Sequence, residues 1–422
     1  MTDQSQFMLS NGLRVITAPM NNLPSATVLV MIGAGSRYEN KNKAGLSHFL
    51  EHMIFKGTRK RPSAFEISSL VDSVGGQNNA FTSKDHTGYF IKLQKNHLEL
   101  AFDLLSDTLK NSLFAPEEIE RERGTILEEI NMYEDTPMYD IDEVFYNLMF
   151  DGHPLGWSVA GDKKTVGSIV REDFMRYCDR FYQGSDMVLA VAGGVREEKI
   201  LKLAEKYFSS FTRGEKEKMV EFKENQAKPR LKIKYKQTDQ CHLYLGYPSF
   251  SFFDEDKVAL AVLGAILGGG MSSRLFIEVR ERRGLAYYVK AVSDLHHETG
   301  YFAARAGVNI GKAHEAVKVI LDEFGKVKKG EVKQEELNKA KEYLKGHVAL
   351  DLEDSLEVAL WYGRKQLLQE ETETPQEMFA KIDKVTLEDV NRVAKRVLVK
   401  EKVNLAMIGP LKEEEKFLEL IS

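Results

Sequence analysis

Apolar and polar residues repeat with a helical period between positions 46 and 55. Successive residues of a helix are rotated by about 100°, so the chain here has two distinct sides. The apolar side consists of Leu46, Phe49, Leu50, Met53 and Ile54, and the other side consists of His48, Glu51, His52 and Phe55. The pattern predicts an amphipathic helix that packs one side into a core and presents two imidazoles and a carboxylate together on the other.

A second amphipathic helix is predicted over residues 116–133. Pro116 stands in its first turn and acidic residues follow, as helix N-termini favour. Its inner side combines apolar and acidic residues, namely Ile119, Glu122, Ile126, Glu129, Ile130 and Tyr133. Burying an unpaired carboxylate is costly. The two glutamates on this side therefore need partners from elsewhere in the protein.

Other segments alternate between apolar and polar residues and predict strands, with long helical segments between them. These strand segments are residues 12–17, 26–32, 89–93 and 187–192. Strands interleaved with long helices predict an α+β fold.

An internal repeat divides the chain. The segment Asp-His-Thr-Gly-Tyr-Phe at residues 85–90 recurs as His-Glu-Thr-Gly-Tyr-Phe at residues 297–302, 212 positions later. Residues 171–193 are echoed by residues 387–409 at an offset of 216. A charged stretch between the two halves resembles an exposed linker. The repeat predicts a first domain, a linker and a homologous second domain at residues 1–213, 214–229 and 230–422.

Composition narrows the class of protein. The chain has 422 residues, of which 43% are hydrophobic, enough for two domains with sizeable cores. A net charge of −5 gives no sign of a nucleic-acid or membrane partner. The first residues lack a signal peptide, although an earlier leader could have been removed. We expect Cys178 and Cys241 to pack as apolar residues without a disulfide, and we expect a cytoplasmic location.

His48 and His52 are spaced so that both rings can bind one zinc ion. With Glu51 between them they form the H-x-x-E-H signature of inverted zinc peptidases, in which the glutamate is the candidate general base. Glu129 is the candidate third ligand. Glu122 would accept a hydrogen bond from a histidine ring, and the alternative for Glu122 is an ordinary salt bridge with an arginine. The alternative interpretation of the motif is that His48 and His52 are solvated side chains on a helix and bind no metal.

Residues 45–58 resemble the zinc-site helix of the family that includes pitrilysin, insulysin and the mitochondrial processing peptidase. Glu129 and Glu122 lie at the spacing of the family's third ligand and auxiliary glutamate. Residues 75–82 resemble its substrate-binding edge strand, and residues 280–287 resemble its Arg/Tyr segment. The resemblance covers essentially the whole chain and is strongest to half-length bacterial processing-peptidase homologues.

The resemblance carries expectations about structure and roles. It implies a largely antiparallel sheet with helices packed on one face in each domain. Arg280 and Tyr287 would stabilise the oxyanion or anchor the substrate, and Phe55 would form a pocket wall, with core filling as its alternative. The substrate strand would comprise Asn78, Asn79, Ala80, Phe81 and Thr82.

The second domain cannot repeat the metal site. The offset of 212 places Leu260 and Gly264 at the positions of the two histidines. The helix predicted over residues 258–267 therefore has no ligands, and we expect one Zn²⁺ per chain, held by the first domain.

The sequence thus predicts a zinc metalloendopeptidase that cleaves short or unfolded peptides, with Glu51 as general base. One chain corresponds to half of the family's closed chamber, so we expect a homodimer, with a heterodimer of homologous subunits as the alternative. A second functional class stays open, because some relatives are non-catalytic peptide-binding or structural subunits of heteromeric complexes.

Overall fold

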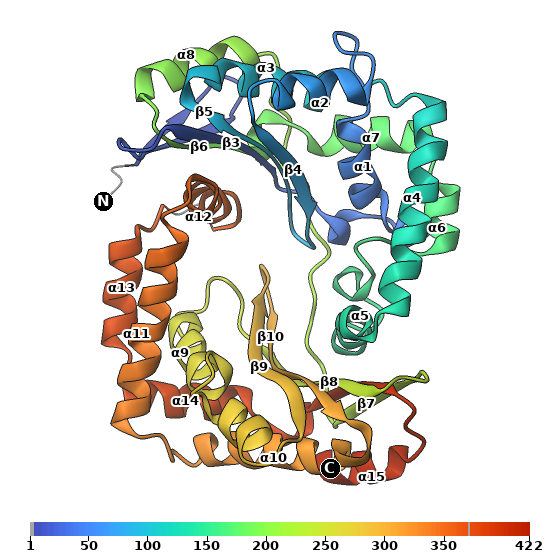
Figure 1. Ribbon diagram of the computed structural model, residues 1–422, viewed down its shortest axis with the longest axis vertical. Helices are drawn as coiled ribbons and strands as arrows, with labels where there is room; N and C mark the ends of the chain where they lie inside the picture. Colours follow the sequence, from blue (N-terminus) through green and yellow to red (C-terminus); the bar gives the residue numbers. More distant parts are fainter. Residues whose placement is uncertain (1–3, 370–371) are drawn as a thin grey trace. The chain divides into compact units, whose positions relative to one another are not determined.

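The computed structural model describes residues 4–369 and 372–422 (Figure 1). The chain forms two compact units, each built around one sheet. The first unit comprises the chain up to Asn131 together with Trp157–Val220 and Asp351–Glu373. The second comprises Met132–Gly156, Glu221–Leu350 and Thr374–Ser422.

The sheet of the first unit has six strands in the order β1-β2-β6-β3-β5-β4. Neighbouring strands are antiparallel except β2 and β6, which are parallel. The strands are β1 (Ser5–Met8), β2 (Arg14–Pro19), β3 (Ser25–Ile32), β4 (Gln77–Thr82), β5 (Thr87–Gln94) and β6 (Met187–Gly193).

Helices cover both faces of this sheet. On β3, Val28 and Val30 point into a core shared with α1, α3 and α8, whereas Leu29 and Met31 pack against α12 on the opposite face. The helices of this unit are α1 (Leu46–Ile54), α2 (Ala64–Asp72), α3 (Leu98–Asn111), α6 (Lys163–Ser168), α7 (Arg171–Phe181), α8 (Glu197–Phe208) and α12 (Ser355–Leu368). Helix α4 (Pro116–Asp135) begins in the first unit and ends in the second.

Strand β4 lies at the edge of the first sheet, where β5 is its one partner among the described strands. The ring of Phe81 lies across Gly88, where a Cβ atom would come within 2.2 Å of the ring. The turn between the two strands is fixed by a buried ion pair of 2.7 Å between Arg37 and Asp85. These contacts hold the edge strand in place beside α1.

The sheet of the second unit has five strands in the order β7-β11-β8-β10-β9. This is the order β2-β6-β3-β5-β4 repeated, and the parallel pair β7–β11 matches the pair β2–β6. The strands are β7 (Arg230–Tyr235), β8 (Gln240–Ser249), β9 (Ala286–Leu295), β10 (Gly300–Asn309) and β11 (Asn404–Gly409). The two units therefore share one strand order, as the internal repeat in the sequence predicts.

The second sheet is also covered on both faces. Leu243 and Leu245 of β8 face a core formed with α9, α10 and α14, whereas Tyr244 stacks on Phe145 of α5 on the other face. The helices are α5 (Pro137–Met149), α9 (Lys257–Gly268), α10 (Ala313–Lys328), α11 (Gln334–Asp351), α13 (Pro375–Lys384), α14 (Leu387–Val397) and α15 (Glu414–Ile421), with a π-helix, η6, at Phe276–Glu281. Short 3-10 helices are η1 (Ser36–Tyr38), η2 (Lys41–Lys43), η3 (Lys95–His97), η4 (Pro154–Gly156), η5 (Gly184–Asp186), η7 (Ile310–Lys312) and η8 (Lys400–Lys402).

The predicted fold class is confirmed, since both units are α+β with largely antiparallel sheets. Each sheet carries one additional helix on its second face, and that helix comes from the other half of the sequence. The compact units therefore differ from the linear division at residues 1–213 and 230–422, because residues 132–156 and 351–373 are exchanged. The chain passes between the units at several points, and one of them, after Val220, lies inside the predicted linker.

Two further sequence expectations concern single residues. Cys178 and Cys241 are both free thiols, as predicted. Tyr133 was expected on the buried side of its helix, but it is 39% exposed. That expectation was wrong, because α4 leaves the first unit's core after Asn131.

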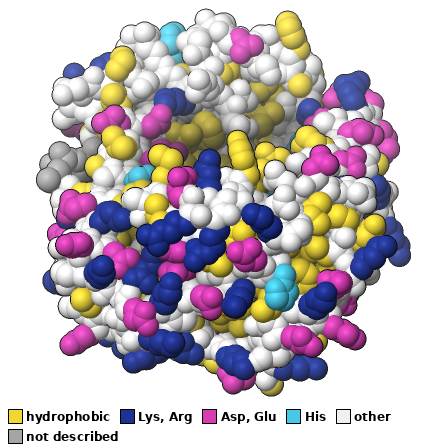
Figure 2. Space-filling view, turned by 60° about the horizontal axis from the view of Figure 1, so that its bottom comes forward, with side chains coloured by type: hydrophobic (Ala, Val, Ile, Leu, Met, Phe, Trp, Pro, Cys, Tyr) yellow, Lys and Arg dark blue, Asp and Glu magenta, His cyan; other side chains and the backbone are white. Residues whose placement is uncertain are grey.

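The surface has no dominant charge on the face shown in Figure 2, where Lys and Arg side chains are interspersed with Asp and Glu side chains. None of the helices in the described part of the chain combines the length and the apolar character needed to cross a membrane.

Candidate metal centre

Helix α1 presents the predicted histidine face because both its packing and its first turn are fixed. All five residues of its apolar side are buried. At its N-terminus the Glu39 carboxylate accepts hydrogen bonds from the backbone N–H groups of Gly45, at 2.7 Å, and Ser47, at 2.6 Å. A carboxylate at this end satisfies free N–H groups and suits the helix dipole. The first turn, which carries His48, is thereby held in place.

Helix α4 supplies the facing carboxylates. Ile119, Ile126 and Ile130 are buried in the first unit's core. Glu122 and Glu129 are seven residues apart, or about two helical turns, so they lie on the same side of α4. The isoleucines anchor the helix while both carboxylates reach toward α1.

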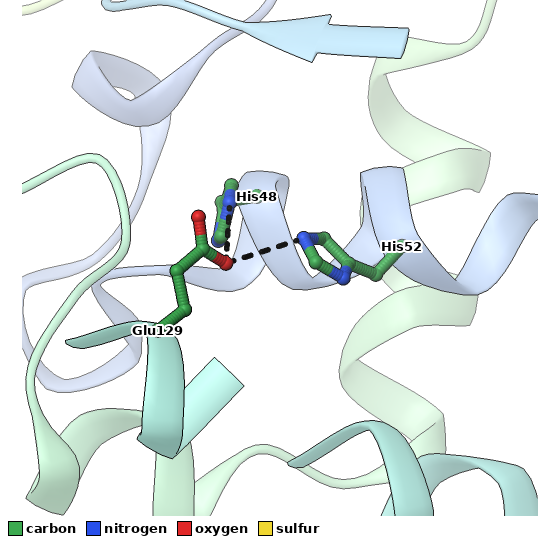
Figure 3. A group of neighbouring side chains, drawn as sticks. All are labelled: His48, His52 and Glu129. Atoms are coloured by element: carbon green, nitrogen blue, oxygen red, sulfur yellow. Dashed lines mark ion pairs between the residues drawn. The ribbon is translucent and has the colours of Figure 1, made fainter. Parts of the chain in front are cut away.

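The structure brings His48, His52 and Glu129 together (Figure 3). One carboxylate oxygen of Glu129, Oε2, lies 3.6 Å from Nε2 of His48 and 3.6 Å from Nε2 of His52. The three side chains are 12%, 21% and 22% exposed, in the order His48, His52, Glu129. The trio is therefore partly buried but reachable from solvent.

The donor set fits a zinc ion. Two ligand atoms on one tetrahedral zinc stand roughly 3.4 Å apart, given bond lengths of about 2.0–2.2 Å. The observed 3.6 Å is close to this value and too long for a hydrogen bond. Burial, with a smaller effect of His52, lowers the pKa of His48 to about 3, so this ring is neutral and its lone pair is available. Imidazole nitrogens with one carboxylate oxygen are a known ligand set of catalytic zinc.

The other ring nitrogen of His52 is held by Glu122. Nδ1 of His52 lies 2.8 Å from Oε1 of Glu122, and donation of its proton leaves Nε2 with the free lone pair. Oε2 of Glu122 lies 2.5 Å from the Lys56 ammonium group. Burial raises the pKa of Glu122, but His52 and Lys56 outweigh it and the net shift is downward. Glu122 thus combines the two roles considered from sequence, although its cation is a lysine and not an arginine.

Glu51 stands beside the trio. Its pKa is raised, mainly by burial and further by the charge of Glu129, while the Thr82 hydroxyl and His52 act in the opposite direction. A carboxylate with a raised pKa binds a proton more readily near neutral pH, as a general base requires.

The predicted substrate strand is β4. Its free edge pairs with no strand among the described residues. Ala80 packs against the core that contains α1, whereas Phe81 packs on the opposite face with residues around α12. The Thr82 hydroxyl, at the end of β4, is the strand group that lowers the pKa of Glu51. Phe55 is half-buried and packs against the first unit's core, with its ring centre 6.1 Å from that of Tyr89.

Arg280 and Tyr287 belong to the second unit. The guanidinium of Arg280 lies 4.8 Å from the ring centre of Phe276 and 5.7 Å from that of Tyr287. Arg280 stands in the π-helix η6, a rare conformation that is frequent at functional sites. Tyr287 is 73% exposed at the start of edge strand β9. The two residues form one contiguous group on the surface of their unit.

Sequence reasoning missed Lys56 and Glu39. Lys56 follows His52 by four residues, a spacing that could have identified it as a neighbour on the same side of the chain. Glu39 lies in a loop six residues before Gly45, where no periodic signal exists.

Two family models of known proteins match consecutive parts of the chain. A family model described as Insulinase (Peptidase family M16) matches residues 14–163, and one described as Peptidase M16 inactive domain matches residues 168–344. An uncharacterized zinc protease of Streptomyces coelicolor is 36% identical, covering 96% of this chain and 90% of that protein. An uncharacterized zinc protease of Bacillus subtilis is 33% identical over 96% of this chain and 98% of its own length.

Solved structures show the same architecture. A protease from Helicobacter pylori has a TM-score of 0.92 and 27% identity, with 97% of this chain and 100% of that chain covered. A Peptidase M16 inactive domain structure from Pseudomonas fluorescens has a TM-score of 0.91 at 19% identity, covers 97% of this chain and 98% of its own, and shows the fold alone. With relatives above 30% identity along almost its whole length, the chain belongs to the M16 family of peptidases.

Proposed function

We propose that the protein is a zinc metalloendopeptidase that hydrolyses peptide bonds in short or unfolded peptides, with one zinc ion per chain. The observation that carries this proposal is the convergence of His48, His52 and Glu129, with Glu51 beside them. The names of its relatives as zinc proteases support it. A non-catalytic role is less well supported, because the chain retains the three candidate ligands together with the candidate base.

His48, His52 and Glu129 would hold the zinc ion. When bound, zinc supplies Lewis-acid chemistry, polarising a carbonyl and making water more acidic. Glu51 accepts a proton from the water that adds to the peptide carbonyl carbon. It then delivers that proton to the nitrogen as the C–N bond breaks, which gives a free amine and a carboxylate.

The substrate would bind as an additional strand on β4. The free edge of β4 offers main-chain N–H and C=O groups to an extended peptide, and side-chain contacts would then select among sequences. Only an unfolded or short chain can supply such a strand. Helix α1, which carries Glu51, packs beside β4, so a peptide seated on this strand would pass close to the base.

We also propose a two-fold homodimer in which Arg280 and Tyr287 of one protomer complete the zinc site of the other. The exposure of Tyr287 and its contact with Arg280 support a role for this pair at a surface. A hydroxyl and a guanidinium could stabilise developing negative charge on the carbonyl oxygen.

Metal analysis and peptide cleavage test the first proposal together. Wild-type protein should contain one zinc per chain and cleave an unstructured peptide library until a chelator is added. His52→Ala should lose stoichiometric zinc, whereas His97→Ala, which changes an exposed histidine, should keep it. Full zinc occupancy in His52→Ala would refute the assignment of the ligands.

Glu51→Gln separates the base from the metal. This variant should bind zinc and peptide normally and lose hydrolysis by roughly 10²- to 10⁴-fold, the usual contribution of general acid–base catalysis. Near-normal turnover would mean that another group activates the water. Zinc binding without cleavage of any peptide by the wild type would favour the peptide-binding alternative.

Mixed dimers test the shared site. Glu51→Gln is one inactive parent, and Arg280→Ala combined with Tyr287→Phe is the other. In a mixed dimer one site carries both lesions and the other carries none. Random exchange makes about half of the dimers mixed, so roughly a quarter of wild-type activity should return under two-fold symmetry. Verified exchange without recovery, or an active monomer, would contradict the homodimer.

A further inference from the structure

We propose that Lys56 is a positioning residue of the metal centre, acting on His52 through Glu122. The inference rests on the proposed zinc site and extends it to a residue that touches no ligand directly. Lys56 Nζ lies 2.5 Å from one oxygen of Glu122, and His52 Nδ1 lies 2.8 Å from the other. The carboxylate therefore bridges an ammonium group and an imidazole.

Glu122 can orient His52 only if its own position is fixed. Its side chain is 7% exposed, so water has little access to either oxygen. A buried carboxylate with a single partner is both costly and free to rotate about its last bond. The second contact, from Lys56, compensates the charge and fixes the plane of the carboxylate. The plane of Glu122 in turn sets the direction of the Nδ1–H bond and thus of Nε2.

The backbone keeps Lys56 in place for this role. Its own N–H bonds to the carbonyl of Met53 at 3.1 Å, at the end of α1. The next residue, Gly57, has φ +141°, and a Cβ atom there would come within 2.6 Å of the Pro62 carbonyl oxygen. The Gly57 carbonyl accepts a hydrogen bond of 3.0 Å from the N–H of Leu113. Lys56 thus starts from a fixed Cα position, which lowers the entropy lost when its side chain is ordered.

Lys56 and Glu122 also connect α1 to α4. The same side of α4 bears Glu129 two turns further on. An ion pair at Glu122 therefore helps set the depth and rotation at which Glu129 meets the two imidazoles.

A direct electrostatic effect of Lys56 on zinc would have the opposite sign. A nearby ammonium group repels a divalent cation, so its removal would strengthen zinc binding. Positioning through Glu122 predicts that removal weakens it. The zinc affinity of the whole protein, measured by competition with a chelator, distinguishes direct repulsion from positioning through Glu122. This measurement does not depend on peptide cleavage.

The variants test whether the charge and the hydrogen bond of Lys56 are needed. Lys56→Met should weaken zinc binding about 3- to 10-fold, less than the roughly 10- to 100-fold expected when a direct partner of a ligand is lost. If Lys56→Met folds poorly, Lys56→Gln provides a second neutral variant, and it should weaken zinc binding to a similar extent. Lys56→Arg keeps the charge and the hydrogen bond and should stay within about 2-fold of wild type.

Lys60→Met is the matched control. Lys60 is 57% exposed and pairs with Asp103, away from the centre. Its replacement should leave zinc affinity unchanged. Thermal unfolding of the zinc-free proteins checks that Lys56→Met has not merely destabilised the fold.

A double-mutant cycle identifies the route. Once Glu122→Gln is present, Lys56→Met should cause no further loss of affinity, because the group through which it acts is gone. Additive losses, unchanged affinity in Lys56→Met, or a gain of affinity would each overturn the proposal. Wild-type protein without stoichiometric zinc would overturn the proposed function, and this inference with it. Stoichiometric zinc with no effect of Lys56 would overturn the inference alone.

Discussion

His48 and His52 stand one turn apart on α1, yet their surroundings differ. His52 is oriented by Glu122 through its Nδ1 atom. Nδ1 of His48 is buried and has no hydrogen-bond partner among the described residues. The orientation of His48 therefore depends on packing, and that of His52 on a polar network. Substitutions around Glu122 should accordingly act on one ligand more than on the other.

A buried carboxyl elsewhere in the first unit gives a pH-dependent prediction. Asp186 is 8% exposed and lies against Gly33, the residue after β3, where a Cβ atom would come within 2.2 Å of its Oδ1. Burial raises the pKa of Asp186 to about 6, while Lys216 and Arg14 act in the opposite direction. The folded protein thus binds this proton more tightly than the unfolded chain does.

The sign of the effect follows from linkage. The protonated carboxyl of Asp186 contributes to the free energy of unfolding. This contribution is fully present below pH 3.8, the usual pKa, and is lost as pH rises through about 6. Asp186→Asn removes the ionisation, so the variant should exceed wild type in free energy of unfolding at pH 8 by up to about 3 kcal/mol. Urea unfolding at pH 5, 6.5 and 8 should show the advantage shrinking toward pH 5. An advantage that does not change with pH would contradict the assignment.

At the scale of elements, α11 holds the loop that precedes the Arg280 segment. Three residues on one side of α11 each bind a different residue of the loop. Glu336 binds Arg274 through two hydrogen bonds of 2.7 and 2.8 Å, Lys339 donates to the carbonyl of Ser272 at 2.7 Å, and the hydroxyl of Tyr343 donates to the carbonyl of Gly269 at 2.6 Å. The loop leads directly into η6, so the helix fixes the start of the Arg280 segment.

Arg274→Lys should weaken this attachment. Lysine cannot form the two-point contact with Glu336, so the free energy of unfolding should fall by about 1–2 kcal/mol. Amide hydrogen exchange at residues 269–274 should become faster. Arg282→Lys is the control, because Arg282 is 67% exposed and pairs only within its own segment, and it should change stability by less than about 0.5 kcal/mol. Equal effects of the two substitutions would argue against the proposed role of α11.

At the scale of the whole molecule, the two halves of the sequence are interleaved. Helix α12 covers Leu29, Met31 and Val188 on the first sheet, although it belongs to the second half of the chain. Helix α5, from the first half, covers the second sheet in the same way. Neither half contains all the apolar surface that completes its own unit.

Fragments of the chain test this interleaving. Residues 1–220 expressed alone should expose an apolar sheet face, aggregate and bind hydrophobic dyes. The same fragment fused to residues 351–373 should aggregate less and bind less dye. Coexpression of residues 1–220 with residues 221–422 should give a complex that purifies as one species. A monodisperse fragment 1–220 with cooperative unfolding would show that α12 is dispensable for the first unit.

The local features of this protein can be predicted from its amino-acid sequence. The two sides of α1, the spacing of His48, Glu51 and His52, and the course of α4 follow from helical periodicity, which depends only on neighbouring residues. The internal repeat could also be recognised from the sequence, because the repeated segments occur in the same order in both halves of the chain. The absence of ligands at Leu260 and Gly264 could also be recognised without a structure.

Which apolar surfaces pack against each other is known only from the tertiary structure. An apolar helix face must be buried, but the hydrophobic effect is not directional and does not specify the partner. The exchange of α5 and α12 could therefore not be predicted from their patterns. The approach of Glu129 to both imidazoles and the bridge from Lys56 to Glu122 depend on distances of a few ångströms between segments far apart in the chain. Such distances arise only when α1 and α4 pack against one common core.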